Sequence, residues 1–359
     1  MSGRSTTVIF DGVCPRAYSG VSLQQGGIGG TEAMVIGLAE SLDLEVMQHN
    51  RTAADGRYLP VAGRAGVGNV IVLRDPDGVA TARRLFPAAR ILLWCHDRIE
   101  PGSTRARQLL KALPAIGSAL AGIVCVSESQ RKAVEATLRN ASVQPAPPTT
   151  TIYNAIADDL LPDATPVDPD KLLFASSPNK GLDYALAAFA SLRRHRPQLR
   201  LHVTNPGYKR NLPTRLPGVT WLGALPRDRG ITEMRSALAV FSPNFVLPET
   251  FGLVFAEANA VGTPVLAHDV GAAREVLDPR QPVLPVKKSQ RILARAGAPL
   301  GSRLRCALAG SGMLTPLFAD YRELIDRWRA GGRPVVAGSA RFRRSAVDAA
   351  WRSLLAADD

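Results

Sequence analysis

Two glutamates in one short stretch have the chemistry of a ligand site. Glu249 and Glu257 lie eight positions apart, and between them Phe251 and Gly252 precede apolar residues at helical spacing. The first backbone N–H groups of a helix have no partner inside it and attract anions, phosphate above all. A carboxylate on either side of such a helix start suits a ligand with hydroxyl groups at both ends and phosphate between them. A sugar nucleotide has that layout.

Two further residues follow strand-like runs. His96 comes directly after the apolar run 91–95, where it could hydrogen-bond a ligand hydroxyl or be satisfied by local backbone. Lys180 lies at the expected start of a helix, where the helix dipole disfavours a cation unless an anion joins it. Phosphate would be that anion, and a solvated surface lysine is the alternative.

A glycine-rich loop precedes the first expected helix. The run from Gly27 to Glu32 is not a dinucleotide fingerprint, because Glu32 stands where the third glycine should be. Flexible backbone there would let phosphate or sugar approach closely, although a plain strand-to-helix turn has the same composition. Thr31 is expected to cap a helix from Glu32 to Leu42.

The rest of the chain alternates strands and helices in two series, joined by a segment rich in Asp and Pro at 158–170. This pattern predicts two doubly wound α/β domains, in which ligands bind at the carboxyl ends of the strands. A length of 359 residues also suits two domains. The expected strands are 6–10, 44–49, 70–73, 91–95, 123–126, 151–153, 172–175, 199–203, 219–222, 239–241 and 264–267.

Composition narrows the class of protein. No uninterrupted apolar run reaches the roughly 18 residues of a transmembrane helix, and no signal peptide is visible. The four cysteines are scattered, which predicts reduced thiols in a cytoplasmic protein with neither a metal site nor a disulfide framework.

The net charge of +13 is uneven, since residues 280–359 hold 15 basic and 6 acidic side chains. Solvated arginines or peripheral contact with the cytoplasmic face of a membrane would explain this basic region. Nucleic acid is not expected, because no binding motif or interleaved aromatic residues accompany the charge.

Together these residues resemble a retaining glycosyltransferase of the GT-B fold, in glycosyltransferase family 4. The central motif is E-x7-E from Glu249 to Glu257, continued by Gly262-Thr-Pro264. Supporting motifs occur in order from residue 6 to about 278: Gly26-Gly-Ile-Gly-Gly30-Thr-Glu, His96-Asp97, Val124-Cys-Val-Ser127-Glu, Tyr153-Asn154-Ala-Ile and Lys180-Gly181-Leu.

The resemblance implies a role for each position. Glu249 would contact donor-sugar hydroxyls near the reacting centre, Glu257 would hold the ribose, and Lys180 would neutralise the departing diphosphate. His96 would touch the donor sugar from the acceptor side. The other implied donor-binding residues are Gly29, Gly30, Asn154, Phe251, Gly252 and Leu253. No metal or other cofactor is implied.

The implied architecture is two Rossmann-like domains facing across a cleft. Residues 1–160 would form the acceptor-side domain, completed by a C-terminal helix at 340–359 that crosses back to it, and 168–338 the donor-side domain. The implied activity is metal-independent transfer of a hexose-type sugar to a glycan or lipid-linked acceptor, in polysaccharide or glycoconjugate synthesis. UDP-sugars are slightly favoured over GDP-sugars. A catalytically inactive sugar-nucleotide-binding protein of the same fold is the alternative.

The chain departs from the family pattern in two places. Many relatives have an arginine a few residues before the lysine, where this chain has Ser176 and Ser177. The diphosphate would then have one fixed cation fewer, unless Lys209 or Arg210 supplies it. In addition, residues 287–338 do not follow the usual family tail.

Overall fold

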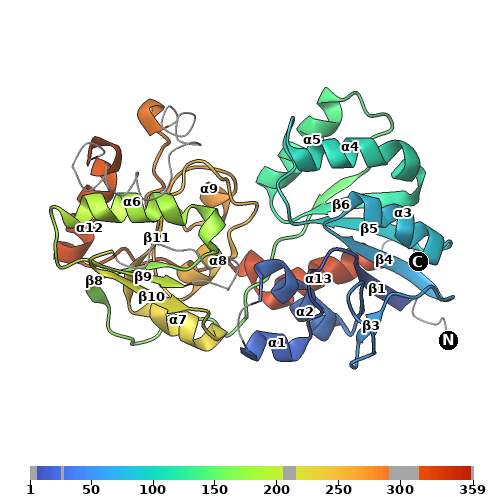
Figure 1. The fold of residues 1–359 in the computed structure, drawn as a ribbon, viewed down its shortest axis with the longest axis horizontal. Helices are drawn as coiled ribbons and strands as arrows, with labels where there is room; N and C mark the ends of the chain where they lie inside the picture. The colour runs from blue at the N-terminus through green and yellow to red at the C-terminus, as the bar shows by residue number, and fades with distance from the viewer. Residues whose placement is uncertain (1–5, 26–27, 205–215, 291–314, 357–359) are drawn as a thin grey trace. The chain divides into compact units, whose positions relative to one another are not determined.

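The protein contains two separate parallel sheets, each with helices on both faces (Figure 1). The computed structural model describes residues 6–25, 28–204, 216–290 and 315–356. The chain divides into two compact units. The N-terminal unit comprises Met1–Ser22, Gly29–Ala155 and Arg341–Asp359, and the C-terminal unit comprises Leu23–Ile28 and Ile156–Ala340. Each unit is a doubly wound α/β domain, as the alternating pattern predicts.

The N-terminal unit is built on a sheet of seven parallel strands in the order β3-β2-β1-β4-β5-β6-β7. Its central strands are continuous apolar runs because both faces of the sheet are covered. The strands are β1 Thr6–Asp11, β2 Glu45–Gln48, β3 Tyr58–Pro60, β4 Val67–Leu73, β5 Arg90–Cys95, β6 Leu120–Cys125 and β7 Thr149–Thr151.

Helices from both ends of the chain cover this sheet. Alternate residues of β5 face opposite sides, so that Leu93 joins the core formed with α3 and α4, while Trp94 meets Trp351 of the last helix. That last helix, α13, packs beside α2 (Figure 1), which confirms the predicted return of the C-terminal helix. The helices are α1 Gly20–Gln25, α2 Gly30–Leu42, α3 Pro76–Leu85, α4 Thr104–Ile116, α5 Glu128–Asn140 and α13 Arg344–Leu355, with short 3-10 turns η1 Gly117–Ala119 and η4 Ala340–Phe342.

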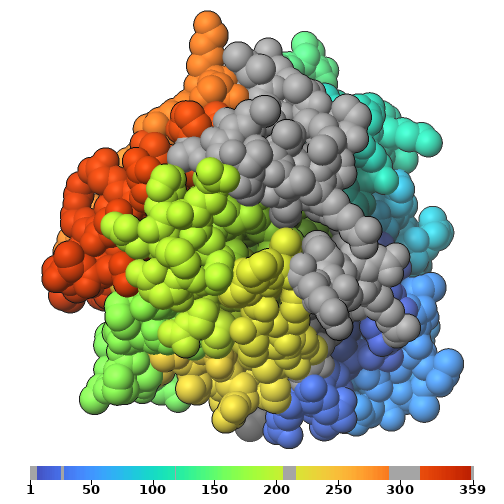
Figure 2. Space-filling view, turned by 60° about the vertical axis from the view of Figure 1, so that its left-hand side comes forward, coloured from blue at the N-terminus to red at the C-terminus, as the bar shows by residue number. Residues whose placement is uncertain are grey.

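The C-terminal unit has a five-stranded parallel sheet in the order β10-β9-β8-β11-β12. One face packs against α6 and α12, which lie side by side (Figure 1) and form neighbouring yellow-green and red surfaces in Figure 2. The strands are β8 Asp168–Phe174, β9 Arg200–Thr204, β10 Val219–Gly223, β11 Ala237–Ser242 and β12 Val265–Ala267. The helices are α6 Leu182–Arg193, α7 Arg227–Arg235, α8 Leu253–Ala260, α9 Ala273–Val276 and α12 Ala319–Gly331, with 3-10 turns η2 Pro178–Lys180 and η3 Thr315–Phe318.

Three local predictions are wrong. Thr31 does not cap the first long helix, because α2 already begins at Gly30 and Gly29 occupies the N-cap position. The segment between the first expected strand and this helix, expected to be a loop, contains the short helix α1. The proposed linker at 158–170 ends within β8, which begins at Asp168 and pairs with Ala237 of β11. The ends of these strands and helices are exposed and polar, so the periodicity of apolar residues does not show where each element begins.

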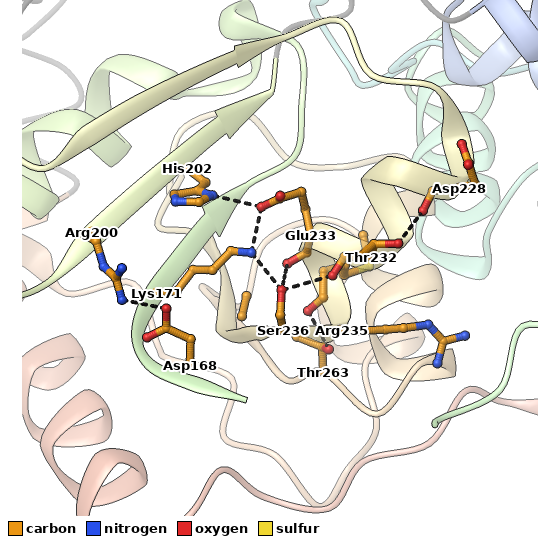
Figure 3. A network of polar contacts seen from close by, with 12 residues as sticks. Asp168, Lys171, Arg200, His202, Asp228, Thr232, Glu233, Arg235, Ser236 and Thr263 are labelled. Carbon is orange, nitrogen blue, oxygen red and sulfur yellow. Dashed lines mark hydrogen bonds and ion pairs between the residues drawn. The ribbon is translucent and has the colours of Figure 1, made fainter. Parts of the chain in front are cut away.

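A buried polar network ties α7 to the second face of the C-terminal sheet (Figure 3). Lys171 of β8 lies with its Nζ 2.6 Å from Glu233 Oε2 and donates a 2.7 Å hydrogen bond to Ser236 Oγ. His202 Nδ1 of β9 is 2.8 Å from the same Glu233 oxygen. Burial raises the pKa of Glu233, but hydrogen bonds from Lys171 and His202 outweigh it and hold that pKa below its usual value. The network therefore fixes α7, which also carries Arg227.

This network predicts a large stability loss for Lys171→Met. The change leaves the half-buried Glu233 carboxylate without its main counter-charge, which should lower the free energy of unfolding by on the order of 3 kcal/mol. Urea denaturation would measure the loss. Lys287→Met is the matched control, because Lys287 pairs with Asp320 at a similar distance of 2.7 Å but both side chains are at least 32% exposed. That surface pair should contribute about 1 kcal/mol or less. Equal losses would contradict the role given to the network.

Candidate functional site

The residues singled out by sequence fall into two groups, one at the carboxyl edge of each sheet. Gly29, Gly30, His96 and Asn154 belong to the N-terminal unit. The larger group belongs to the C-terminal unit and consists of Lys180, Glu249, Phe251, Gly252, Leu253 and Glu257. Each group is described within its own unit.

Glu249 is held at both its backbone and its side chain. Its carbonyl oxygen accepts a 3.0 Å hydrogen bond from Ala272 N, and its backbone forms an isolated bridge with Gly271. Its Oε2 accepts a 2.6 Å hydrogen bond from Lys180 Nζ. The lysine side chain is 49% exposed, so this ion pair contributes about 1 kcal/mol at most and a ligand could separate it at little cost.

Two glycines make the close packing around this pair possible. Gly271 has φ of 61°, and a Cβ there would overlap the carbonyl oxygen of Glu249. Gly181 has φ of 94°, and its Cβ would come 2.9 Å from Asn244. Asn244 in turn fixes the loop before Glu249, because its Oδ1 accepts 3.0 Å hydrogen bonds from the N–H groups of Val246 and Leu247. The turn carrying Lys180 and the loop carrying Glu249 are thus packed together.

Helix α8 begins between the two glutamates, as the sequence suggests. Gly252 is its N-cap residue, with φ of 87°, and no side chain caps the helix at this position. A Cβ at Gly252 would lie 2.8 Å from the Phe255 ring, so the sharp entry into α8 requires glycine. Phe251 is buried and anchors the turn, and Leu253 is the first helical residue. The start of α8 can therefore offer backbone N–H groups to an anion.

Glu257 lies on the second turn of α8 and has a partner that sequence reasoning missed. Arg227, the first residue of α7, donates from Nη2 to Glu257 Oε1 at 2.8 Å. Burial raises the pKa of the Glu257 carboxyl, and Arg227 offsets part of that rise. Both site glutamates therefore rest against a basic side chain of their own unit, Glu249 against Lys180 and Glu257 against Arg227.

In the N-terminal unit, His96 follows β5 and is 8% exposed. Its ring packs against Trp94, with the ring centroids 4.5 Å apart. Burial and the nearby Arg74 guanidinium lower the pKa of His96 to about 3, against an opposing effect of Asp97. The imidazole is therefore neutral at physiological pH and can exchange hydrogen bonds with a hydroxyl group, but it is not the protonated imidazolium that acts as a general acid.

Asp97 has a structural role beside that histidine. Arg74 Nη2 donates to its Oδ1 at 2.7 Å, and Arg105 Nη2 lies 3.0 Å from its Oδ2. Its carbonyl oxygen accepts a 2.7 Å hydrogen bond from Gln130 Nε2. Burial raises the pKa of Asp97, but the arginines outweigh it and keep that pKa low. The carboxylate thus stays ionised and anchors the chain directly after His96.

The remaining N-terminal residues lie at the start of a helix and after a strand. Gly29 and Gly30 form the uncapped start of α2, where Ala33 N donates to Gly29 O at 3.0 Å. Asn154 follows β7 and is 8% exposed, and its Oδ1 is buried without a hydrogen-bond partner among the described residues. A buried amide oxygen without a partner is costly and can accept a hydrogen bond from a ligand.

Comparison with known proteins gives this arrangement a context. Residues 166–296 match the family model described as "Glycosyl transferases group 1". A 104-residue segment is 33% identical to a phosphatidyl-myo-inositol mannosyltransferase of Mycobacterium leprae, and the alignment spans 28% of each protein. Two solved structures of similar fold cover 98% of this chain. They are a sucrose-phosphate synthase from Thermosynechococcus elongatus (TM-score 0.60, 16% identity, 100% of that chain) and Anabaena Alr3699/HepE in complex with UDP-glucose (TM-score 0.62, 16% identity, 99% of that chain).

The chain has the GT-B fold. In this GT-B protein the family match includes the whole run from Lys180 to Glu257. Within the described ranges, no cluster of three or more His, Cys, Asp or Glu side chains could hold a metal ion, and no helix is long and apolar enough to cross a bilayer.

The sequence did not identify two residues that contact the site glutamates from distant positions in the chain. Arg227 is thirty positions from Glu257, and Gly271 follows Glu249 by more than twenty, so no local pattern connects them. The positive φ at Gly271 is the one feature that the residue type suggests, because glycine readily adopts this conformation. The predicted substitutes for the missing arginine, Lys209 and Arg210, lie outside the described residues.

The backbone contact beneath Glu249 predicts a strong effect of Gly271→Ala on this GT-B protein. The added Cβ must displace the Glu249 carbonyl, in addition to the roughly 1–2 kcal/mol of strain from a left-handed backbone. Gly223→Ala is the matched control, since Gly223 has φ of 68° but open space around its Cβ position. Urea denaturation should show a clearly larger loss for Gly271→Ala. Equal losses would mean that the contact with Glu249 adjusts freely.

Proposed function

We propose that this chain is a retaining, metal-independent glycosyltransferase. It would move a hexose-type sugar from a nucleoside-diphosphate sugar to a glycan or lipid-linked acceptor, in the synthesis of cell-surface polysaccharide or glycoconjugate. The observation that carries the proposal is the contact between Lys180 and Glu249 near the uncapped start of α8. The match of this region to the group 1 glycosyltransferase family supports it.

The bond that breaks in a sugar nucleotide has phosphate on one side and sugar on the other. A basic group suits the phosphate, and an acidic group suits the hydroxyls of the sugar. Lys180 and the first N–H groups of α8 would hold the diphosphate, and Glu249 would accept hydrogen bonds from hydroxyls of the attached sugar. Glu257 would accept a hydrogen bond from the ribose, and Arg227 offsets part of the rise in the pKa of its carboxyl group. Phe251, Gly252 and Leu253 would present backbone to the donor, and Gly29, Gly30, His96 and Asn154 would contribute from the N-terminal unit.

In the proposed reaction, the bond between the sugar C1 and the diphosphate oxygen breaks, and its electron pair stays on phosphate. The acceptor hydroxyl attacks C1 from the same face, and its proton passes to the departing phosphate oxygen. Lys180 and α8 would stabilise the charge that develops on phosphate, so metal assistance is not required. Neutral His96 would orient the donor sugar by hydrogen bonding. Glu249 is not proposed as a covalent nucleophile.

The choice of donor follows from the proteins of similar fold. Several of their structures contain UDP or UDP-glucose, and the mannosyltransferase relative supports a hexose. UDP is therefore the proposed nucleotide, ahead of GDP. A thermal-shift panel with UDP, GDP, ADP and CMP would identify the base, because a ligand that binds only the native state raises its stability.

Changes at the two glutamates should separate their roles. Glu249→Gln should abolish sugar transfer while keeping nucleotide affinity, and Glu257→Gln should weaken nucleotide binding about tenfold through loss of a charged hydrogen-bond acceptor. Radiolabelled sugar transfer and calorimetry would measure the two effects, with Glu323→Gln on an exposed turn of α12 as control. EDTA should leave transfer unchanged. Full activity of Glu249→Gln would overturn the mechanism, and nucleotide binding without turnover of any donor would favour the inactive-binder alternative.

The proposal also puts the protein in the cytoplasm, with peripheral contact between its basic C-terminal region and the cytoplasmic face of the membrane. Deleting that region is a poor test, because Phe342 and Trp351 are fully buried in the N-terminal unit. The double change Arg341→Glu/Arg352→Glu should instead weaken binding to anionic phospholipid vesicles in a sedimentation assay. Arg139→Glu/Arg274→Glu has the same charge change at exposed positions elsewhere. Equal binding by both variants would exclude specific contact through the C-terminal region.

A further inference from the structure

We infer that Trp351, on the C-terminal helix α13, is a positioning residue that sets the orientation of His96 through Trp94. Three aromatic rings from distant parts of the chain form a continuous stack inside the N-terminal unit. The centroids of Trp351 and Trp94 are 5.0 Å apart at an interplanar angle of 73°, and those of Trp94 and His96 are 4.5 Å apart at 56°. The inference rests on the proposed function only in giving His96 a role in sugar transfer.

All three rings are enclosed by protein. Trp351 is 0% exposed, Trp94 2% and His96 8%. Aromatic contacts at these distances contribute roughly 0.5–1.5 kcal/mol beyond simple burial, and they favour particular ring orientations. Trp94 therefore lies between the helix and the histidine, and a change in the Trp351 ring must alter what the Trp94 ring can pack against.

The backbone on either side of His96 is already fixed. Residues before it belong to β5, and Asp97 after it is held by Gln130 and by two arginines. The orientation of the His96 ring is set by its side-chain torsions, whose terminal torsion has a broad energy well. Trp94 packs against that ring, so this aromatic contact favours some rotations of the imidazole over others.

The helix that supplies Trp351 is tied to the same strand at a second point. Arg90, the first residue of β5, donates from Nη1 to the carbonyl oxygen of Leu354 at 2.7 Å, near the end of α13. Arg90 and Trp94 of one strand thus contact Leu354 and Trp351 of one helix turn. This double attachment fixes the register of α13 against β5, and with it the depth at which the indole meets Trp94.

The alternative is that Trp351 only fills the core. A filling role predicts that shortening the side chain lowers stability, as it would at any buried tryptophan, and leaves the environment of His96 unchanged. A positioning role predicts an additional effect on His96 itself. The two roles differ in the titration of His96 and in the split between turnover and donor binding.

The experiment compares full-length Trp351→Leu and Trp351→Phe with Trp328→Phe, which alters a buried tryptophan in the core of the C-terminal unit. Histidine resonances would be followed by NMR against pH, with His96→Asn giving the assignment. In the wild type, His96 should not titrate above pH 5. In Trp351→Leu, loosened packing admits water and should move its titration upward, toward the ordinary pKa near 6.5. Trp351→Phe should move it less, and Trp328→Phe not at all.

Activity provides the second measurement. Trp351→Leu should lower kcat about tenfold, because a misplaced contact group costs turnover, and should leave nucleotide affinity unchanged. If Trp351→Leu does not fold, Trp351→Phe and Arg90→Gln, which removes the bond to Leu354, should both shift the His96 titration. An unchanged titration in every folded variant would overturn the inference. Absence of turnover in the wild type would refute the proposed function instead, and the titration would still decide the role of Trp351.

Discussion

A parallel strand buried on both faces can offer a ligand only the residues beyond its carboxyl end. This constraint governs the positions of the candidate site residues in both units. His96 and Asn154 follow β5 and β7, and Lys180 and Glu249 follow β8 and β11. Because all strands within a sheet run in one direction, polar groups far apart in sequence gather at one edge of it. Because the strands themselves are apolar and buried, the polar candidate residues lie in the segments that follow them.

The same constraint explains how much of the fold could be predicted from the sequence. Continuous apolar runs such as Ile91–Cys95 and the helical periodicity of α6 identify buried elements, because elements that are largely buried consist mostly of apolar residues. The residues at which helices begin were harder to predict from the sequence. The prediction that Thr31 caps α2 relied on a preferred side chain, whereas Gly29 takes that position with backbone alone. The short strand β3 and helix α1 bury too few apolar residues to give a recognisable apolar pattern in the sequence.

The candidate site was predictable to the level of the residues that carry its motif, and less so for their partners. The pairs Lys180–Glu249 and Arg227–Glu257 join residues on different elements, and no spacing rule connects them. These pairs change the electrostatics of the site, since a basic side chain offsets the negative charge of each carboxylate. A diphosphate that approached the C-terminal unit would meet two basic side chains engaged with acids, one of them a half-exposed lysine that can be redirected at little cost. Arg227 also shows that the serines at 176 and 177 do not leave Lys180 as the sole cation beside the E-x7-E motif.

The neutral state of His96 limits the chemistry that can be written for the site. With a pKa near 3, its imidazole cannot supply a proton to a departing phosphate at physiological pH. Glu249 Oε2 accepts a hydrogen bond from Lys180 Nζ. In the proposed mechanism the departing diphosphate, which gains negative charge, takes the proton that the acceptor hydroxyl releases. In that mechanism the protein would hold charge and geometry in place, with the packed turns at Gly181 and Gly271 positioning Lys180 and Glu249 and the aromatic rings behind His96 positioning the imidazole.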